Sequence, residues 1–221
     1  MALTRRELTD AVERAIGALA PVYRGAAAES DLYEAALLTI AVQASEAAGG
    51  TCLITNDGRT QSSLLTFRRS PGNLWLGDFT HVVVNFPDTP RRLEIHLGVY
   101  VVGGSKVPHE CDVAVIDQEE AERSRQGLVH PRRPKLVASI EAKHYAASPG
   151  IGIGRAFIGL SAELGQAKCT LAFPARRSSS VAALLAARPS ECFDELVPNG
   201  PAAQRLRSHL DQRIRNWIAR G

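Results

Sequence analysis

The sequence predicts an α/β (α+β) protein in which a mixed central β-sheet is flanked by helices. Three observations favour this fold class: the chain opens with segments of helical periodicity, continues through short β-branched runs, and then alternates strand and helix. With 221 residues, of which 45% are hydrophobic, the chain is long enough to bury a sizeable core. It contains no convincing linker and no internal repeat, so we expect one domain.

Two helices are expected before the first strand. Thr4 and Glu7 have the spacing of a capping box, and apolar residues follow at helical spacing until Pro21. A second helix is expected from about residue 30 to residue 48, where two glycines end it.

A meander of antiparallel strands, additional to the core of the sheet, is expected next. Short β-branched or alternating runs are separated by turn signals such as N-D-G and S-P-G-N. The expected strands are residues 51–55, 62–67, 81–86 and 93–102.

The second half of the chain predicts strands at 111–117 and 135–143, a helix at 154–166 and a strand at 168–173. The polar segment between the first two of these strands is expected to be an exposed loop. We therefore place the core at about residues 30–175, followed by a helical extension over about 177–221. The extension ends in an arginine-rich amphipathic helix, whose arginines we interpret as a solvated face.

Composition limits the function only weakly. The net charge of +3 permits a nucleic-acid partner without requiring one. The four cysteines form no C-x-x-C pair, so the sequence indicates neither a zinc site nor a redox motif. The first residues lack the apolar segment of a signal peptide, and no window approaches a membrane span of about 18 apolar residues. We expect a cytoplasmic protein without membrane association.

Three ionisable residues are expected to meet at one edge of the sheet. Asp112 begins one strand, and Glu141 and Lys143 end its expected neighbour in the segment S-I-E-A-K-H-Y. Two close carboxylates repel each other unless a cation lies between them, and a hard ion such as Mg²⁺ prefers oxygen ligands. A lysine beside such a site can hold or deprotonate an attacking water and stabilise phosphorane-like charge. The alternative is an ordinary ion pair at a strand end, which contributes at most about 1 kcal/mol.

These residues and the order of the elements around them resemble the PD-(D/E)xK nuclease superfamily, which has the restriction-endonuclease-like fold. The resemblance consists of Asp112 in H-E-C-D-V-A-V-I-D, Glu141 and Lys143 in S-I-E-A-K-H-Y, and the order α–β–β–β–α–β. It covers roughly residues 30–175. The position before Asp112 holds cysteine, where the superfamily's motif has proline.

The resemblance implies a hydrolase that cleaves DNA, less often RNA, with Mg²⁺, for which Mn²⁺ can substitute. It implies that Asp112, Glu141 and the backbone carbonyl of Ala142 bind the metal, and that Lys143 positions the nucleophilic water. Many members add an acid from the first core helix, for which Glu34 is the candidate here and Glu46 the reserve. Glu110 shares the expected strand face of Asp112 and is a further candidate ligand.

Several side chains are candidates for contacting nucleic acid, most of them basic. The expected loop contains many cations that could follow a phosphate backbone, although a solvated loop is equally consistent with them. The two residues after the motif could contact substrate or simply pack. The candidates are Arg123, Arg125, Arg132, Arg133, His144, Tyr145 and Arg155.

The resulting hypothesis is an endonuclease that acts on double-stranded DNA as a homodimer, since cutting both strands requires two sites. The resemblance alone suggests restriction or anti-phage defence. One alternative is a catalytically silent protein of nuclease fold that binds nucleic acid or a partner. Another is a structural or regulatory domain with an accidental E-x-K, which predicts that Asp112 and Lys143 lie far apart. Carboxylates of Asp112 and Glu141 more than about 8 Å apart, too far for one ion to bridge, would contradict the nuclease hypothesis.

Overall fold

A mixed β-sheet forms the centre of the molecule. The structure is a computed structural model that describes residues 3–186, 188 and 190–220. Within them the sheet has seven strands, which lie in the order in which they occur in the chain. They are β1 (Thr51–Thr55), β2 (His81–Asn85), β3 (Arg92–Val102), β4 (Pro108–Asp117), β5 (Leu136–Ala142), β6 (Cys169–Ala172) and β7 (Glu191–Phe193). Successive strands are antiparallel from β1 to β5, and β6 and β7 then run parallel to β5.

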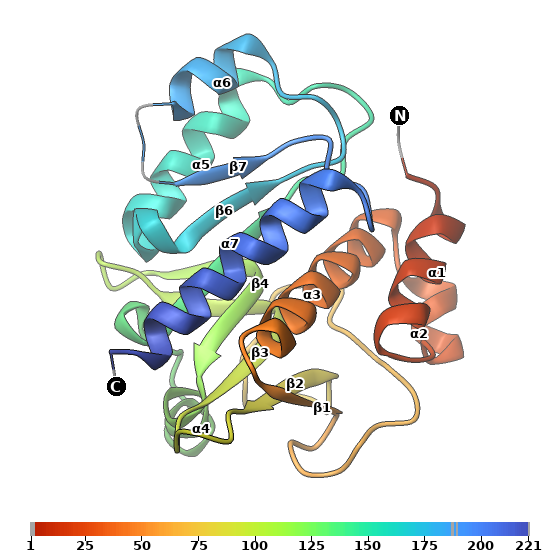
Figure 1. Ribbon diagram of the computed structural model, residues 1–221, viewed down its shortest axis with the longest axis vertical. Coiled ribbons are helices and arrows are strands. Elements are labelled where there is room, and N and C mark those ends of the chain that lie inside the picture. Colours follow the sequence, from red (N-terminus) through yellow and green to blue (C-terminus); the bar gives the residue numbers. More distant parts are fainter. Residues whose placement is uncertain (1–2, 187, 189, 221) are drawn as a thin grey trace.

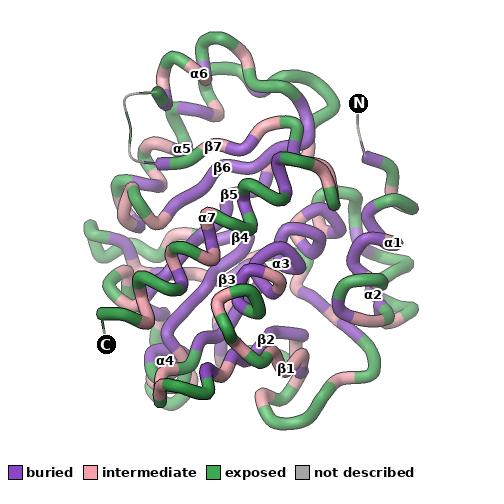
Figure 2. Tube along the Cα trace, viewed as in Figure 1, coloured by how far each residue is buried: buried purple, intermediate pink, exposed green. Residues whose placement is uncertain are grey.

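Helices cover both faces of this sheet, as Figure 1 shows. The described helices are α1 (Arg5–Ile16), α2 (Pro21–Ala26), α3 (Glu29–Ala47), α4 (Gln118–Gly127), α5 (Ile151–Leu164), α6 (Ser179–Leu185) and α7 (Pro201–Ile218), with short 3₁₀ turns η1 (Arg133–Lys135) and η2 (Gln166–Lys168). Apolar residues of α1, α3 and α7 form one core cluster with one face of the sheet. Residues of α4, α5 and α6 form a second cluster with the other face. Figure 2 shows α3 and the central strands as the most buried elements.

The α+β fold class is confirmed, and most of the expected elements are present. Thr4 and Glu7 form the expected capping box at the start of α1. The expected helices at 30–48 and 154–166 correspond to α3 and α5, and the strands expected at 93–102, 111–117, 135–143 and 168–173 correspond to β3 to β6.

The strand expected at 62–67 is wrong. Leu65 and Phe67 are buried in the core as an apolar strand would be. The backbone of Leu65, however, bonds to Ala18 and Ala20 in the turn after α1 rather than to a neighbouring strand. The apolar pattern therefore predicts the burial of these residues correctly, but it does not predict which backbone segment forms hydrogen bonds with them.

The loop expected between β4 and β5 is also wrong in part, because its first half is the helix α4. Asp117 caps this helix by accepting from the N–H of Glu119. The buried face of α4 consists of Glu120, Ala121 and Ser124. Glu120 is 1% exposed and accepts from Arg123 and Arg132, each at 2.6 Å. A polar segment can be helical here because two arginines neutralise the carboxylate on its buried face.

Replacing Glu120 with alanine should lower the free energy of unfolding by about 2 kcal/mol. The substitution leaves the two arginines without their carboxylate and removes the acceptor for the N–H of Arg132. Denaturant unfolding measures the effect. The matched control is Glu119→Ala, which truncates the exposed neighbour on the same helix; equal losses in both variants would contradict the role of Glu120.

The alternation of side chains between the two faces of the sheet shifts by one residue where β3 pairs with β4 near Asp112. Leu97 and its partner Val113 belong to the cluster under α3, but the next pair, Val99 and Cys111, belongs to the opposite cluster. Gly98 lies between them with a φ of 55°. Strict alternation would have kept the two pairs on one face. The shift places the side chain of Asp112 on the side of α3, inside a strand rather than at its start.

Replacing Gly98 with alanine should destabilise the protein by about 1 kcal/mol, because a side chain at positive φ is strained. The added Cβ would also lie 3.4 Å from the carbonyl oxygen of Ser70. Thermal unfolding measures the change. Gly159→Ala is the control, since Gly159 is in helix α5 with no atom within 4 Å of an added Cβ. That control should be neutral or stabilising, and a stabilised Gly98→Ala variant would contradict the account.

The expected helical extension after residue 177 needs one correction. It contains α6 and α7, but β7 lies between them and pairs in parallel with β6. Leu206, Leu210 and Ile214 of α7 are fully buried against the core that contains α3. The segment is thus part of the sheet and of its main core.

Candidate functional site

The candidate site lies where β4 and β5 separate. Pairing between the two strands begins at Val113 and Ile140. Beyond that pair, the backbone N–H of Ala142 donates to Oδ2 of Asp112 over 2.7 Å. This bond ties the carboxylate of Asp112 to the end of β5 and fixes its position.

Lys143 joins the two acids that the sequence predicted at this edge. Its Nζ lies 2.6 Å from Oε1 of Glu141 and 3.6 Å from Oδ2 of Asp112. The separation of these two oxygens cannot exceed the sum of the two distances, which is below the limit of about 8 Å set for bridging by one ion. Asp112, Glu141 and Lys143 therefore meet at one point, as expected from their places in the chain.

Burial and mutual interaction determine the charges of this triad. Burial raises the pKa of Asp112, although Lys143 and the N–H of Ala142 oppose that rise. Burial, with the nearby charge of Asp112, also raises the pKa of Glu141. Burial alone would lower the pKa of Lys143, but the two carboxylates outweigh it and raise that pKa. Lys143 is thus an ammonium at neutral pH and partly balances two acids that repel each other.

Two further carboxyl groups border the triad. Glu34 of α3 has a pKa raised to about 8 by burial first and then by the charge of Asp112. Burial and Asp112 also raise the pKa of Glu110 on β4. Glu46, the reserve candidate, is exposed in the last turn of α3. Of the two acids considered on this helix, Glu34 is the one that shares the environment of Asp112.

The donor atoms gathered here are oxygens. Within the described residues, no group of three or more His, Cys, Asp or Glu side chains is arranged to hold a metal ion. Asp112 and Glu141 supply two carboxylates, and Mg²⁺ is commonly held by one or two carboxylates together with waters. Their chemistry fits a hard divalent cation.

The residues that follow the motif separate into packing and exposed positions. The ring of His144 packs against that of Tyr33 with centroids 5.4 Å apart. Tyr145 is 42% exposed, and Arg155 is exposed near the start of α5. The contact of His144 with a buried tyrosine favours the packing interpretation for this residue, whereas Tyr145 and Arg155 remain accessible.

Three of the four candidate cations between β4 and β5 are paired within the protein. Arg123 and Arg132 bind the buried Glu120, and Arg125 binds Glu94, which is 2% exposed. Arg133 has no acidic partner in the described part of the chain. The arginine-rich sequence therefore serves mainly to pair with buried acids, and of these four arginines Arg133 alone has no acidic partner among the described residues.

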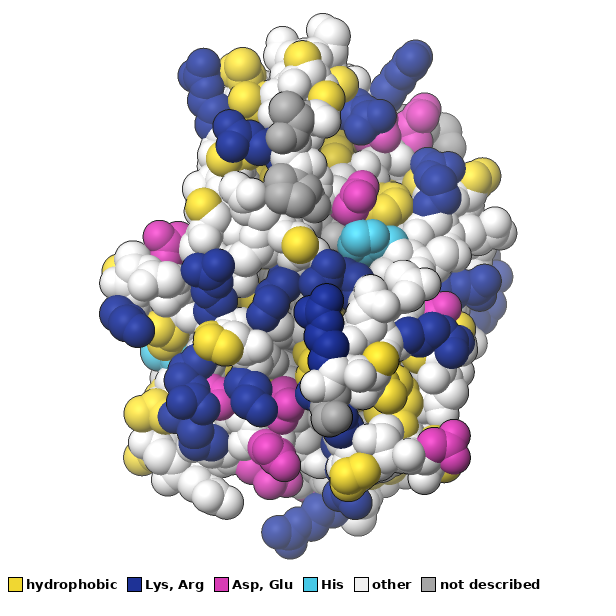
Figure 3. Space-filling view, turned by 60° about the vertical axis from the view of Figure 1, so that its left-hand side comes forward, with side chains coloured by type: hydrophobic (Ala, Val, Ile, Leu, Met, Phe, Trp, Pro, Cys, Tyr) yellow, Lys and Arg dark blue, Asp and Glu magenta, His cyan; other side chains and the backbone are white. Residues whose placement is uncertain are grey.

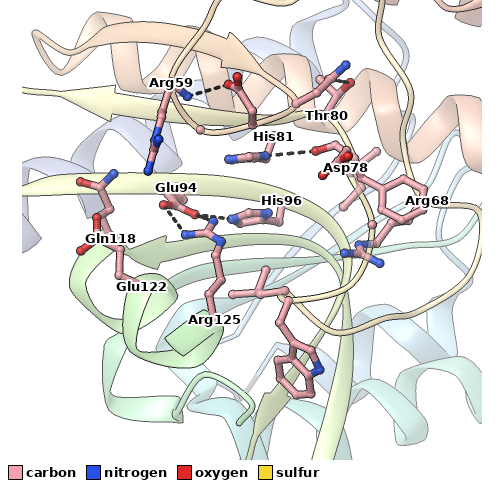
Figure 4. A pocket seen from close by; sticks show the side chains of 18 of the residues that line it. Arg59, Arg68, Asp78, Thr80, His81, Glu94, His96, Gln118, Glu122 and Arg125 are labelled. Atoms are coloured by element: carbon pink, nitrogen blue, oxygen red, sulfur yellow. Dashed lines mark hydrogen bonds and ion pairs between the residues drawn. The ribbon is translucent and has the colours of Figure 1, made fainter. Parts of the chain in front are cut away.

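A cavity of about 670 Å³, shown in Figure 4, is lined by none of the three residues of the triad. The turn 56–59, strands β2 and β3 and helix α4 line it, among other segments. On its floor the rings of His81 and His96 are stacked with centroids 4.8 Å apart. Glu94 accepts from His96 at 2.8 Å and also from Arg125.

The polar groups on the floor of this cavity mostly satisfy one another. His96 and Arg125 overcome the effect of burial and lower the pKa of Glu94 to about 2, while burial lowers the pKa of His96 to about 4. Glu94 is therefore charged and His96 neutral at physiological pH. The alternation L-E-I-H-L was the sequence signal that placed Glu94 and His96 on one strand face, and it was not used in predicting a site.

Comparison with known proteins adds no further identification. The chain matches no protein-family model, no curated protein and no solved structure. No helix in the described part of the chain has the length and apolar character needed to cross a membrane.

Proposed function

We propose that the protein is a nuclease that hydrolyses phosphodiester bonds in DNA with the help of Mg²⁺ or Mn²⁺. The observation that carries this proposal is the position of the Lys143 ammonium between the carboxylates of Glu141 and Asp112. The order of α3, β3, β4, β5, α5 and β6 supports the resemblance to the PD-(D/E)xK superfamily. A site of two fixed carboxylates and one ammonium at a strand end suits a phosphodiester substrate.

The acidic side chains and Lys143 would have different roles in the reaction. A bound divalent cation would supply a more acidic water and charge neutralisation at the phosphate. Asp112 and Glu141 would hold that cation together with the backbone carbonyl of Ala142, and Glu34 would be a further ligand. Lys143, whose pKa the two carboxylates raise, would orient the water and stabilise negative charge on the phosphoryl oxygens.

We also propose a cellular compartment, an oligomeric state and a biological role for the protein. All four cysteines are free in the structure, which supports a reducing compartment such as the cytoplasm. Cleavage of both strands of a duplex requires two sites, so we propose that the protein acts as a homodimer. Restriction or anti-phage defence is the biological role that follows from the resemblance.

A cleavage assay tests the proposed function. Purified protein is incubated with plasmid, linear duplex DNA and RNA in Mg²⁺, Mn²⁺ or EDTA. We expect cleavage of DNA that EDTA abolishes, and a loss of at least about a hundredfold in Lys143→Ala. Lys106→Ala, which removes an exposed lysine from the β3–β4 turn, is the matched control. Cleavage that persists both in EDTA and in the Lys143→Ala variant would refute the mechanism. DNA binding without any cleavage would favour the catalytically silent alternative.

A further inference from the structure

Four cations gather at the end of the sheet where β5 and β6 begin. We define the basic patch as Arg133 of η1, Lys168 of η2, Arg213 of α7 and Arg220, which follows α7. Figure 3 shows lysine and arginine side chains collected across the middle of the face on which these elements lie. The charges of Arg133, Arg213 and Arg220 all act on Lys168, so the four groups lie in one neighbourhood.

Backbone carbonyls hold two members of the patch in place. Nζ of Lys168 donates to the carbonyl oxygen of Arg133 at 2.8 Å and to that of Pro134 at 3.3 Å. Nε of Arg213 donates to the carbonyl oxygen of Val137 at 3.4 Å. Both side chains are thus fixed around the segment that enters β5. A fixed cation loses little conformational entropy when it binds an anion.

The acidic side chains that the structure describes do not balance the charge of the patch. Among the described residues, no acidic side chain lies within 4.0 Å of any of the four cationic groups, whereas the neighbouring Arg132 and Lys135 pair with Glu120 and Asp117. Burial and the three arginines lower the pKa of Lys168 to about 8. Like charges held together at a partly buried surface are unfavourable, and a bound anion would relieve that cost.

We propose that the basic patch binds the phosphate backbone of nucleic acid at a distance from the candidate site. Lysine and arginine held in fixed positions suit phosphate oxygens, and several cations in one cluster suit a polymer with regularly spaced charges. β5 has seven residues and runs from the patch to Glu141, a distance of about 20 Å at roughly 3.3 Å per residue. A duplex covers this distance in about six base pairs. The placement relative to the cleaved bond rests on the proposed function, whereas the binding itself rests on charge and geometry.

Binding in EDTA tests this inference separately from cleavage. Fluorescence anisotropy follows a labelled 30-base-pair duplex over a range of salt concentrations. Lys168→Ala/Arg213→Ala should weaken binding about tenfold and reduce the slope of log K against log salt by about 1.8, since each lost phosphate contact accounts for about 0.9. Arg205→Ala/Arg207→Ala removes the same charge from exposed positions in the first half of α7 and should change affinity less than about twofold.

A second variant distinguishes a loss of positive charge from a loss of folding. Arg220→Glu reverses the charge of an exposed member of the patch and should also weaken binding. If the patch variants and the Arg205/Arg207 control bind with the same affinity and salt slope, the inference is overturned. If the patch variants lose binding but no preparation cleaves DNA, the inference holds and the proposed nuclease function fails.

Discussion

Asp112→Asn is expected to reduce DNA cleavage by at least about a thousandfold while the protein stays folded. The amide oxygen of asparagine can still accept from the N–H of Ala142, which is the bond that fixes this side chain. The neutral amide cannot balance Lys143 or supply a negatively charged metal ligand. Cleavage rates on plasmid DNA with Mg²⁺, together with the thermal unfolding temperature, measure the two parts of the prediction.

The control for this variant is on the same strand. Asp117 lies at the other end of β4, where it pairs with Lys135 and caps α4. Asparagine is also a good cap, so Asp117→Asn should keep its activity. The Asp112→Asn variant should in addition lose any increase in unfolding temperature that Mg²⁺ gives the wild type. Wild-type cleavage by Asp112→Asn would place the chemistry elsewhere in the molecule.

Glu34→Gln is expected to remove a pH dependence of folding stability. The pKa of Glu34 is raised from 4.5 to about 8 in the folded protein, by burial first and by Asp112 next. Between these two values the folded state holds a proton that the unfolded state has released, so stability falls as pH rises from about 4.5 to about 8. The neutral glutamine avoids this loss. At pH 8.5 the variant should be more stable than the wild type by about 4.5 kcal/mol, and at pH 4.5 the two should be nearly equal.

Denaturant unfolding in EDTA at several pH values between 4.5 and 8.5 measures this difference. Glu46→Gln, an exposed substitution near the end of the same helix, should follow the wild-type curve. Superimposed curves for Glu34→Gln and the wild type would show that Glu34 is not held near Asp112 in a buried environment.

The sequence was most informative where burial follows a simple period. The helical spacing of α3 and the apolar run of β5 report buried faces directly, and they place Glu141 and Lys143 at a strand end. The meeting of these residues with Asp112 followed from the assumption that their strands pair, which the structure shows for β4 and β5.

The errors arose where side chains other than apolar ones decided the structure. Helix α4 was predicted to be a loop because its buried Glu120 depends on arginines at other positions, and no periodicity reveals such partners. Asp112 was expected at a strand start, but β4 begins at Pro108 and the face pattern changes at Gly98. A local shift of this kind depends on the backbone of the neighbouring strand, which the sequence of β4 does not encode.

The short strands at the two edges of the sheet affect how a homodimer could form. β1 has five residues and β7 has three, so each edge offers few unpaired backbone groups to another chain. Short edge strands discourage the joining of sheets between molecules, and they also protect against aggregation. A dimer of this protein should therefore associate through helix or loop surfaces, with each subunit keeping its own sheet and its own Asp112–Glu141–Lys143 triad intact.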